Sequence, residues 1–494
     1  MNNNKRIIFY LFLASLFISC SNGPLKHSSS FEFYPDSNNA IINEFYYVPQ
    51  ELRYNLKDIN KQINWHSSQS LGNQQLLIIP IQLSDGPKFT SEMIDNLQEV
   101  FFSNNPQNCY ESVKSFFYKS SYGQLTLDGE IFTPFESKYS SISLNIKGQS
   151  AAFAIIEEIL TTKNFLSEAQ RSAFDLNHDK FIDNTILIYS NDYAENATGA
   201  FWAWSDYYIS KKKSDKTLIN NFMWSSYQFI NNKYSDGYDE YSLDSHTFIH
   251  ETGHLLGLDD YYSYDDNDVW NPSGVIDMQA YNIGDHNVFS KVLLGWIKPI
   301  VITSSCIINL KTSANYPEAI LLKKGWNGSM FDEYILIEYY TPQNLNYLDS
   351  IHRYENDYMF QKSGLRIYHV DARIVCLEEN IVGKYQPLYY TDFINEDDEY
   401  TYYIGASNSI CNSYLNAPYN KKFRLLHLLD QGQNNTINGQ LDYENTLWEK
   451  HHKFNSHMNF FINENKFNDG TSIGYEIEVI DTSTIEAKIK IDIS

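Results

Sequence analysis

The chain has 494 residues, of which 43% are hydrophobic and 16% aromatic. This length and composition are sufficient for two or three folded domains and exclude an intrinsically disordered chain. Its 37 Lys and Arg stand against 61 Asp and Glu, a formal net charge of -24, so neither a basic face for phosphate groups nor a nucleic acid partner is expected.

The N-terminus carries the pattern of a signal peptide. Lys5 and Arg6 precede an apolar run over residues 7–18, which is too short to cross a membrane as a mature helix. The run ends at a serine followed by Cys20, and this ending resembles the lipobox of bacterial lipoproteins, in which the cysteine is lipidated after cleavage. We predict a signal peptide over residues 1–19 and an exported protein anchored at a bacterial cell envelope, contacting the membrane only through lipid on Cys20. A secreted protein with an ordinary signal peptide is the alternative.

Residues 20–70 are polar and rich in Ser and Asn, which predicts a lipid-anchored tether with a short pro-segment. The other four cysteines, Cys109, Cys306, Cys376 and Cys411, are widely spaced and include no CxxC pair. In an exported chain they can form two disulfides in three ways, and their spacing does not choose among these. The spacing does not indicate a metal cluster.

The next part of the chain mixes strand and helix patterns. An apolar run over residues 76–83 predicts a buried strand, in which Pro80 favours a sheet edge or a bulge. Further strands are predicted at residues 124–129 and 185–189. Helices are predicted at residues 91–102, 109–118 and 150–160. The mixture predicts an α/β, or α+β, catalytic domain over residues 71–300.

A weaker metal pattern lies between the predicted helix and strand of this domain. Asp175, Asn177, Asp179 and Asp183 are spaced like the first ligands of a calcium loop. However, Lys180 replaces the turn glycine, and an isoleucine stands where the bidentate glutamate would be. An acidic turn before a strand is therefore the favoured interpretation, and a Ca²⁺ site is the alternative.

The segment from His250 to Asp260 carries the most specific chemistry. On a helix, His250 and His254 lie one turn apart on the same face and can bind one metal ion, while Glu251 between them suits a general base. Gly257 permits the helix to stop and the chain to turn back, so that Asp260 completes three protein ligands and leaves a fourth position open. This pattern predicts a catalytic Zn²⁺ site. A helix whose histidines are merely exposed or satisfied in the core is the alternative.

Two details of this segment stay open in the sequence. Either Asp244 or Ser245 can cap the start of the helix. Asp259 is adjacent to Asp260 and is the alternative third ligand.

Beyond residue 300 the sequence becomes rich in strand patterns. Alternating apolar stretches separated by Asn, Asp and Gly turns predict strands at residues 334–339, 365–370, 475–480 and 485–491. We predict a second, β-rich and sandwich-like domain over residues 301–494.

Four further segments extend the pattern of the metal helix. They are a helix with a Ser-Tyr-Gly turn at residues 112–123, Gly-Val-Ile-Asp-Met at residues 274–278, a segment ending in Leu-Gly-Trp at residues 290–296, and a strand at residues 364–371. Together with the metal helix they resemble the secreted metallopeptidases typified by immune inhibitor A, a bacterial branch related to the metzincins. The similarity runs, with gaps, from about residue 74 to the C-terminus.

The resemblance implies a metzincin-like catalytic domain and a role for each matching residue. It makes His250, His254 and Asp260 the zinc ligands, Glu251 the general base and acid, and Met278 the residue beneath the metal. An unbranched thioether also suits that place physically, because it can fill an irregular apolar floor under the ligands.

Two residues near Met278 in the sequence are not assigned as ligands. Tyr281 comes one position later than the tyrosine ligand of some metzincins, although a role in stabilising a tetrahedral oxyanion is open to it. His286 is interpreted as a satisfied loop histidine.

These features predict a zinc-dependent metalloendopeptidase that hydrolyses peptide bonds of extracellular proteins. A surface binding or adhesion lipoprotein that keeps the peptidase fold is the first alternative. Hydrolysis of a non-peptide amide by the same chemistry is the second.

Overall fold

The protein is described by a computed structural model. The described residues are 33–34, 68–193, 199–208, 216–262, 274, 276–326, 332–372, 374–379, 385–389, 425–433, 444–458, 460 and 465–494. The predicted signal peptide, Cys20 and Cys411 lie outside them. Within these residues no helix combines the length and the apolar character needed to cross a membrane.

The first sheet is built from strands of the N-terminal half. Its order is β3 (Leu125–Ile131), β2 (Gly72–Gln82), β6 (Thr185–Tyr189), β9 (Asn221–Ser226) and β7 (Trp204–Tyr207), with β4 (Phe135–Glu136) also beside β2. The neighbours from β3 to β9 are parallel, and β7 is antiparallel to β9. In the described part of the chain, β7 is thus the outermost strand on that side.

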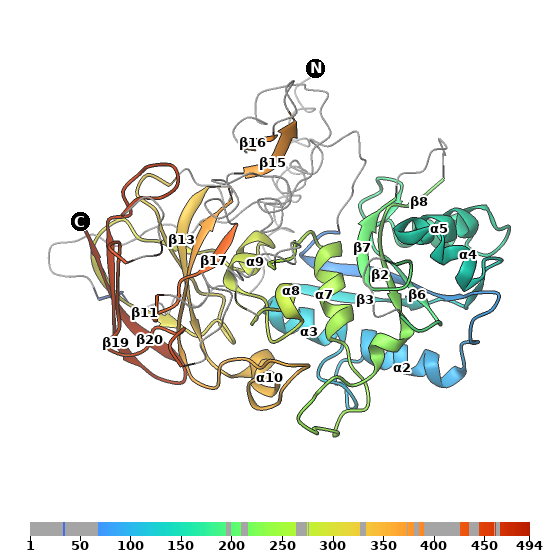
Figure 1. Ribbon diagram of the computed structural model, residues 1–494, viewed down its shortest axis with the longest axis horizontal. Helices are drawn as coiled ribbons and strands as arrows, with labels where there is room; N and C mark the ends of the chain where they lie inside the picture. The colour runs from blue at the N-terminus through green and yellow to red at the C-terminus, as the bar shows by residue number, and fades with distance from the viewer. Residues whose placement is uncertain are drawn as a thin grey trace, which may run out of the picture.

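Helices cover both faces of this sheet (Figure 1). Leu76 and Ile78 of β2 belong to a core that includes residues of α2 (Ser91–Phe102), α3 (Val113–Ser120) and α7 (His246–Leu255). Leu77 and Ile79 point the opposite way, into a second core with α5 (Ala151–Thr161). The sheet and its helices confirm the predicted mixture of α and β structure.

Most predicted elements of this part are found close to their predicted bounds. The helix at residues 91–102 and the strand at residues 185–189 match α2 and β6. The helix predicted from residue 109 begins only at Val113. Ser112 is the reason, because its hydroxyl accepts the Ser115 N–H at 2.9 Å and caps the helix there.

Pro80 lies in the interior of the sheet, so the predicted edge or bulge is wrong. The Ile78 carbonyl accepts the N–H of Phe132, just after β3, and the Gln82 carbonyl accepts the N–H of Ser137, just after β4, each at 2.8 Å. The backbone of Pro80 faces this same side, at the gap where β3 has ended and β4 has not begun. Its missing N–H therefore removes no ladder hydrogen bond.

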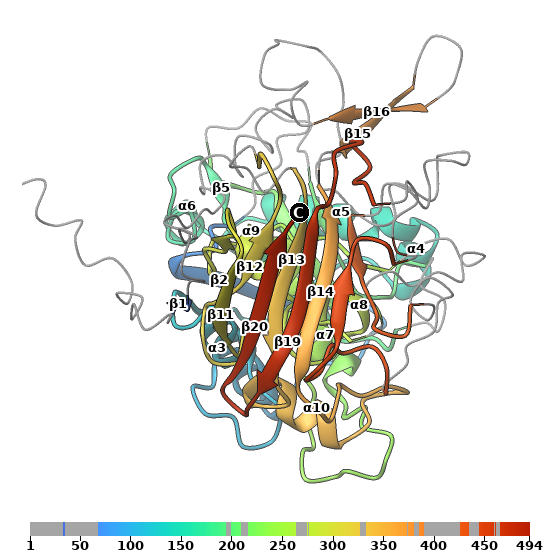
Figure 2. The same ribbon diagram turned by 90° about the vertical axis from the view of Figure 1, so that its left-hand side faces the viewer.

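Two five-stranded sheets form most of the C-terminal part (Figure 2). The outer sheet has the order β1 (Phe33–Tyr34), β11 (Cys306–Lys311), β20 (Glu486–Ile493), β19 (Tyr475–Thr482), β18 (Lys453–Asn455). The inner sheet has the order β10 (Ile300–Val301), β12 (Ile320–Leu322), β13 (Glu333–Tyr340), β14 (Gly364–Asp371), β17 (Leu426–Leu428). Strands were predicted at β13, β14, β19 and β20, whereas the polar composition of the predicted tether did not indicate β1.

The inner sheet is buried on both faces. Ile335 and Ile337 of β13 pack in a core shared with the outer sheet. Tyr334 and Leu336 face the other way and pack with Phe289 of α9 (Val288–Leu293), which follows the metal helix in sequence. Every residue of β13 and β14 is buried as a result. The C-terminal strands therefore pack directly against the part of the chain that carries the site.

Two of the cysteines are buried free thiols in different cores. Cys109 lies beneath α2 and α3, and Cys306 lies between the two C-terminal sheets. Burial raises the pKa of Cys109 above its ordinary value and raises the pKa of Cys306 to about 11. Both thiols are thus un-ionised at neutral pH and do not pair with each other.

The packing between the two C-terminal sheets can be tested by comparing Ile→Ala substitutions at a buried and at an exposed position. Ile337→Ala empties a fully buried position between the sheets, so we expect a loss of about 2–5 kcal/mol in the free energy of unfolding. Ile485→Ala is the matched control, because its side chain is 53% exposed, and we expect a change of about 0.5 kcal/mol or less. Urea unfolding measures both. Equal losses would mean that Ile337 does not lie in a packed core.

Candidate metal centre

The helix α7 carries both histidines and stops where the sequence predicts. Ser245 is its N-cap residue by position but makes no side-chain cap hydrogen bond, whereas the preceding Asp244 carboxylate accepts the His246 N–H at 2.9 Å. After the last turn, Gly257 adopts φ 97°, which favours glycine. Its N–H donates to the His254 carbonyl at 2.8 Å and the chain reverses toward the helix.

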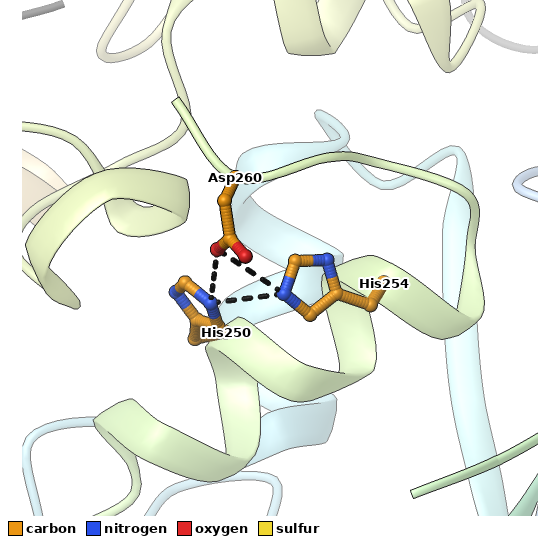
Figure 3. A group of neighbouring side chains, drawn as sticks. All are labelled: His250, His254 and Asp260. Carbon is orange, nitrogen blue, oxygen red and sulfur yellow. Dashed lines mark hydrogen bonds and ion pairs between the residues drawn. The ribbon is translucent and has the colours of Figure 1, made fainter. Parts of the chain in front are cut away.

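This reversal brings three side chains together (Figure 3). His250 and His254 project from adjacent turns of α7, and their Nε2 atoms lie 3.0 Å apart. One Asp260 oxygen, Oδ1, lies 3.0 Å from Nε2 of His250 and 3.4 Å from Nε2 of His254. Across the described residues, these are the one group of three His, Cys, Asp or Glu ligand atoms within 4.8 Å of one another.

The hydrogen bonds of the two rings decide which nitrogen faces the centre. Nδ1 of His250 lies 2.7 Å from the Met278 carbonyl, and Nδ1 of His254 lies 2.9 Å from the Leu258 carbonyl. A carbonyl oxygen only accepts, so each Nδ1 carries a proton and each neutral ring keeps its lone pair on Nε2. Two lone pairs and a carboxylate that converge at these distances repel one another unless a cation lies between them. Two imidazoles and one carboxylate are a donor set that fits zinc.

The pKa values of His254 and Asp260 also indicate that the site favours a positive charge. Burial by itself lowers the pKa of His254, but the Asp260 carboxylate raises it to about 10. Burial alone raises the pKa of Asp260, yet the two histidines hold it well below its usual range. A proton and a metal ion therefore compete for the same place, and metal affinity rises with pH.

Glu251 lies beside the ligands with a partner that the sequence did not indicate. Its side chain is 6% exposed, and burial raises the pKa of its carboxyl. The hydroxyl of Ser205, on the outermost strand β7, lies 3.0 Å from Oε2 of Glu251 and 2.9 Å from its backbone carbonyl. A hydroxyl has one proton to donate, so Ser205 donates to one of these two oxygens or shares its proton between them.

Tyr262, rather than Tyr281, faces the carboxylates of the site. Burial and the negative charges of Asp260 and Glu251 raise the pKa of Tyr262 well above its ordinary value, so its phenol stays protonated and can donate. Tyr281 is 46% exposed, with its ring centroid 6.0 Å from that of Tyr262. The sequence offered no pattern for Tyr262, because its place depends on the reversal after α7.

Met278 forms part of the apolar floor near the helix. It is fully buried in the core that includes Phe248 and Leu255 of α7, and it begins the short helix α8 (Met278–Tyr281). A Cβ on Gly253 would lie 2.2 Å from Oε1 at the end of the Gln279 side chain. A glycine between the two ligand histidines therefore leaves room for this side chain of α8.

His286 is structural, in agreement with its interpretation as a satisfied histidine. It is 1% exposed, with Nδ1 3.2 Å from the Ser120 hydroxyl and Nε2 3.3 Å from Oε1 of Gln279. Burial lowers its pKa well below the ordinary value, so the ring is neutral.

A third histidine of α7 was missed. His246 precedes His250 by one helical turn and is fully buried, with Nδ1 2.7 Å from Asp244 and Nε2 3.4 Å from Asp349 of α10 (Tyr347–Ile351). Burial alone lowers its pKa, but the two carboxylates, Asp349 foremost, raise it to about 9. This charged triad joins the start of the metal helix to the C-terminal part.

The acidic segment at residues 175–183 forms a tight turn. The carboxylate of Asp175 accepts the N–H groups of Asp179 and Lys180 at 3.0 and 3.1 Å, and that of Asp183 accepts the Leu176 N–H at 2.9 Å. Lys180 takes the position of the missing glycine with φ 71°. Burial and the neighbouring charges of Asp179 and Asp175 raise the pKa of Asp183 to about 7. The favoured acidic turn is present, and the alternative Ca²⁺ site, with Asn177 as a further ligand, stays a prediction.

Comparisons with known proteins give little similarity. No protein-family model and no curated protein matches the chain. One similar solved structure is that of metalloproteinase-II from Bacteroides fragilis, with a TM-score of 0.23 and 13% identity over 49% of this chain and 61% of that chain. The aligned part thus spans less than two thirds of that metalloproteinase, and a TM-score this low does not establish a common fold. Membership of the immune inhibitor A family remains a prediction from the motifs.

Neighbouring aspartates permit a matched test of the third ligand. Asp260→Ala removes the oxygen that lies close to both Nε2 atoms, so we expect the protein to lose stoichiometric zinc. Asp259→Ala removes the same groups one residue earlier, and we expect zinc to be retained. Metal analysis after dialysis measures both. Loss of zinc in the Asp259 variant alone would identify Asp259, and not Asp260, as the third ligand.

The His246 triad predicts a dependence of stability on pH. Because the pKa of folded His246 is raised from 6.5 to about 9, the protonated ring stabilises the fold fully below pH 6.5, and this contribution is lost as the pH rises toward 9. The loss amounts to roughly 3 kcal/mol. We expect chemical unfolding of the zinc-loaded protein to show it over this window and His246→Gln to flatten it. His451→Gln, at an exposed histidine, is the control, and an unchanged slope in the His246 variant would contradict the assignment.

Proposed function

We propose that the protein is a zinc-dependent metalloendopeptidase. The observation that carries this proposal is the convergence of two Nε2 lone pairs and one carboxylate, with a buried Glu251 beside them. Three protein ligands that leave a position open are typical of catalytic zinc sites, whereas structural sites use four. His250, His254 and Asp260 would hold the ion.

The residues around the ion would each have a separate role in catalysis. Bound zinc supplies an acidified water and polarises a carbonyl. Glu251 is placed to accept the proton of the attacking water and to return it to the leaving amine, and its raised pKa suits both steps. Ser205 keeps the Glu251 carboxyl in place. The protonated phenol of Tyr262 hydrogen-bonds to the Asp260 carboxylate and would help to orient this ligand, while the oxyanion role of Tyr281 stays a prediction.

The position of β7 favours a peptide over a small amide. This strand, the outermost of the described strands on its side of the sheet, contacts α7 and carries Ser205, so it runs beside Glu251. An extended peptide that adds to the edge of a sheet is bound through its backbone, so a peptidase can bind substrates of many different sequences in this way. We propose proteins and peptides as substrates, not nucleic acid.

The location of the enzyme is also proposed from the sequence. The N-terminal pattern supports export and a lipid anchor on Cys20, with a secreted form as the alternative. Its substrates would accordingly be extracellular proteins.

Glu251→Gln separates chemistry from metal binding. The amide cannot take the proton of the water, so we expect hydrolysis of casein and of quenched peptides to fall by about 10²–10⁴-fold while zinc stays stoichiometric. Glu130→Gln, an exposed position on β3, is the control and should keep full activity. A chelator should abolish wild-type cleavage. Wild-type turnover in the Glu251 variant would refute the assigned base, and a wild-type protein without zinc would refute the proposed function.

A further inference from the structure

The Met278 turn, residues 276–287, is held by the C-terminal part of the chain. Its importance comes from one contact: the Met278 carbonyl lies 2.7 Å from Nδ1 of His250. A ligand histidine is oriented by the group that accepts its second N–H, and such groups strongly affect metal affinity. Whatever fixes this carbonyl therefore fixes the direction in which the His250 lone pair points.

Asp277 organises the turn from its N-terminal end. Its carboxylate oxygens accept the N–H of Gln279 at 2.8 Å and the N–H of Asn287 at 2.7 Å, so it caps α8 and closes the loop after it. Asp277 is 2% exposed. Burial raises the pKa of Asp277 to about 7, while the N–H of Gln279, the charge of Arg366 and the N–H of Asn287 oppose this shift.

Arg366 reaches this turn from the inner sheet. On β14, opposite Glu338 of β13, it is 1% exposed, and its Nη2 lies 2.8 Å from Oε1 of Glu338. Its Nη1 lies 3.4 Å from the Ile276 carbonyl, and its charge also acts on Asp277. The Tyr340 ring lies 5.0 Å from the guanidinium and restricts its movement.

The C-terminal end of the Met278 turn is held by residues that lie between β13 and β14 in the sequence. The Gly284 N–H donates to Asp349 of α10 at 2.7 Å, and the Asp285 N–H donates to Oδ1 of Asn346 at 3.0 Å. Asp349 is fully buried. The segment that presents a carbonyl to His250 is thus held at both ends by residues that follow it by more than fifty positions in the sequence.

We propose that Arg366 is a positioning residue of the metal centre, which acts through the 276–277 backbone and Asp277 on the Met278 carbonyl and thereby on His250. Arg366 touches neither the ligand atoms nor a substrate. The C-terminal sheets are then a working part of the metal site and not only an appended binding module. This inference rests on the proposed zinc site but not on peptidase activity.

The test replaces both members of the Arg366–Glu338 pair, so that neither is left in the core without the other. Arg366→Met combined with Glu338→Leu fills the same space with apolar groups, a change that is often neutral or stabilising for the fold. In the full-length protein we expect thermal unfolding to stay near that of the wild type. The Kd for zinc, measured by competition with a chromophoric chelator, should rise about 10–100-fold. The visible spectrum of the cobalt-substituted protein should change as well, because it reports the geometry of the ligands.

A second ion pair, with Lys323 buried and Asp469 exposed, provides a control for loss of an ion pair in the C-terminal part. Lys323 and Asp469 form an ion pair in the C-terminal part, away from the Met278 turn. Lys323→Met with Asp469→Leu should leave the zinc Kd and the cobalt spectrum unchanged. If this control weakens zinc as much as the Arg366 pair does, general loosening explains the effect and the proposal is overturned.

The remaining outcomes are also decisive. A folded Arg366/Glu338 variant with the wild-type zinc Kd and cobalt spectrum overturns the proposal. If that variant does not fold, Arg366→Lys decides instead: it keeps the charge opposite Glu338 but lacks the second arm toward Ile276, so an unchanged Kd again overturns it. A wild-type protein that binds no zinc refutes the proposed function itself, which is a different result from either.

Discussion

Two imidazole nitrogens with lone pairs, held 3.0 Å apart beside a carboxylate, are unfavourable without a positive charge between them. The structure around the site maintains this arrangement. The pitch of α7 places His250 and His254 on adjacent turns, the left-handed Gly257 returns the chain to bring Asp260, and backbone carbonyls hold both Nδ1 protons away from the centre. Removing any of these constraints relieves the repulsion and also removes the preference for a metal ion.

The carbonyl beneath His250 links the site to the rest of the molecule. Gly253 leaves room for the Gln279 side chain of α8, and the ends of the Met278 turn are held from α10 and from β14. The sheet that contains β14 is packed on both faces, by the outer sheet on one side and by α9 on the other. A separate binding domain would need an exposed polar face toward the catalytic part, and β13 and β14 have none.

Several of the segments singled out in the sequence meet in one polar cluster. Lys291 forms an ion pair with Asp285 and lies over the ring of Tyr122, while Ser120 donates to Asp285 at 2.6 Å. The Ser-Tyr-Gly turn and the segment before Leu-Gly-Trp are thus contact partners beneath the Met278 turn. Each buried polar group in such a cluster needs a hydrogen-bond or ion-pair partner, which gives a physical reason for finding these motifs in one chain.

The sequence determined what depends on neighbours within a few positions. Helical spacing identified His250, Glu251 and His254, and apolar periodicity located α2, β6 and the main C-terminal strands. Tertiary structure decided what depends on distant partners: that Pro80 faces a gap between two strands, that Ser205 reaches Glu251, and that His246 and Arg366 are buried against carboxylates. Side-chain spacing repeats along one element and is visible in its residues, whereas the burial and pairing of a polar group are set by chain segments that no local pattern specifies.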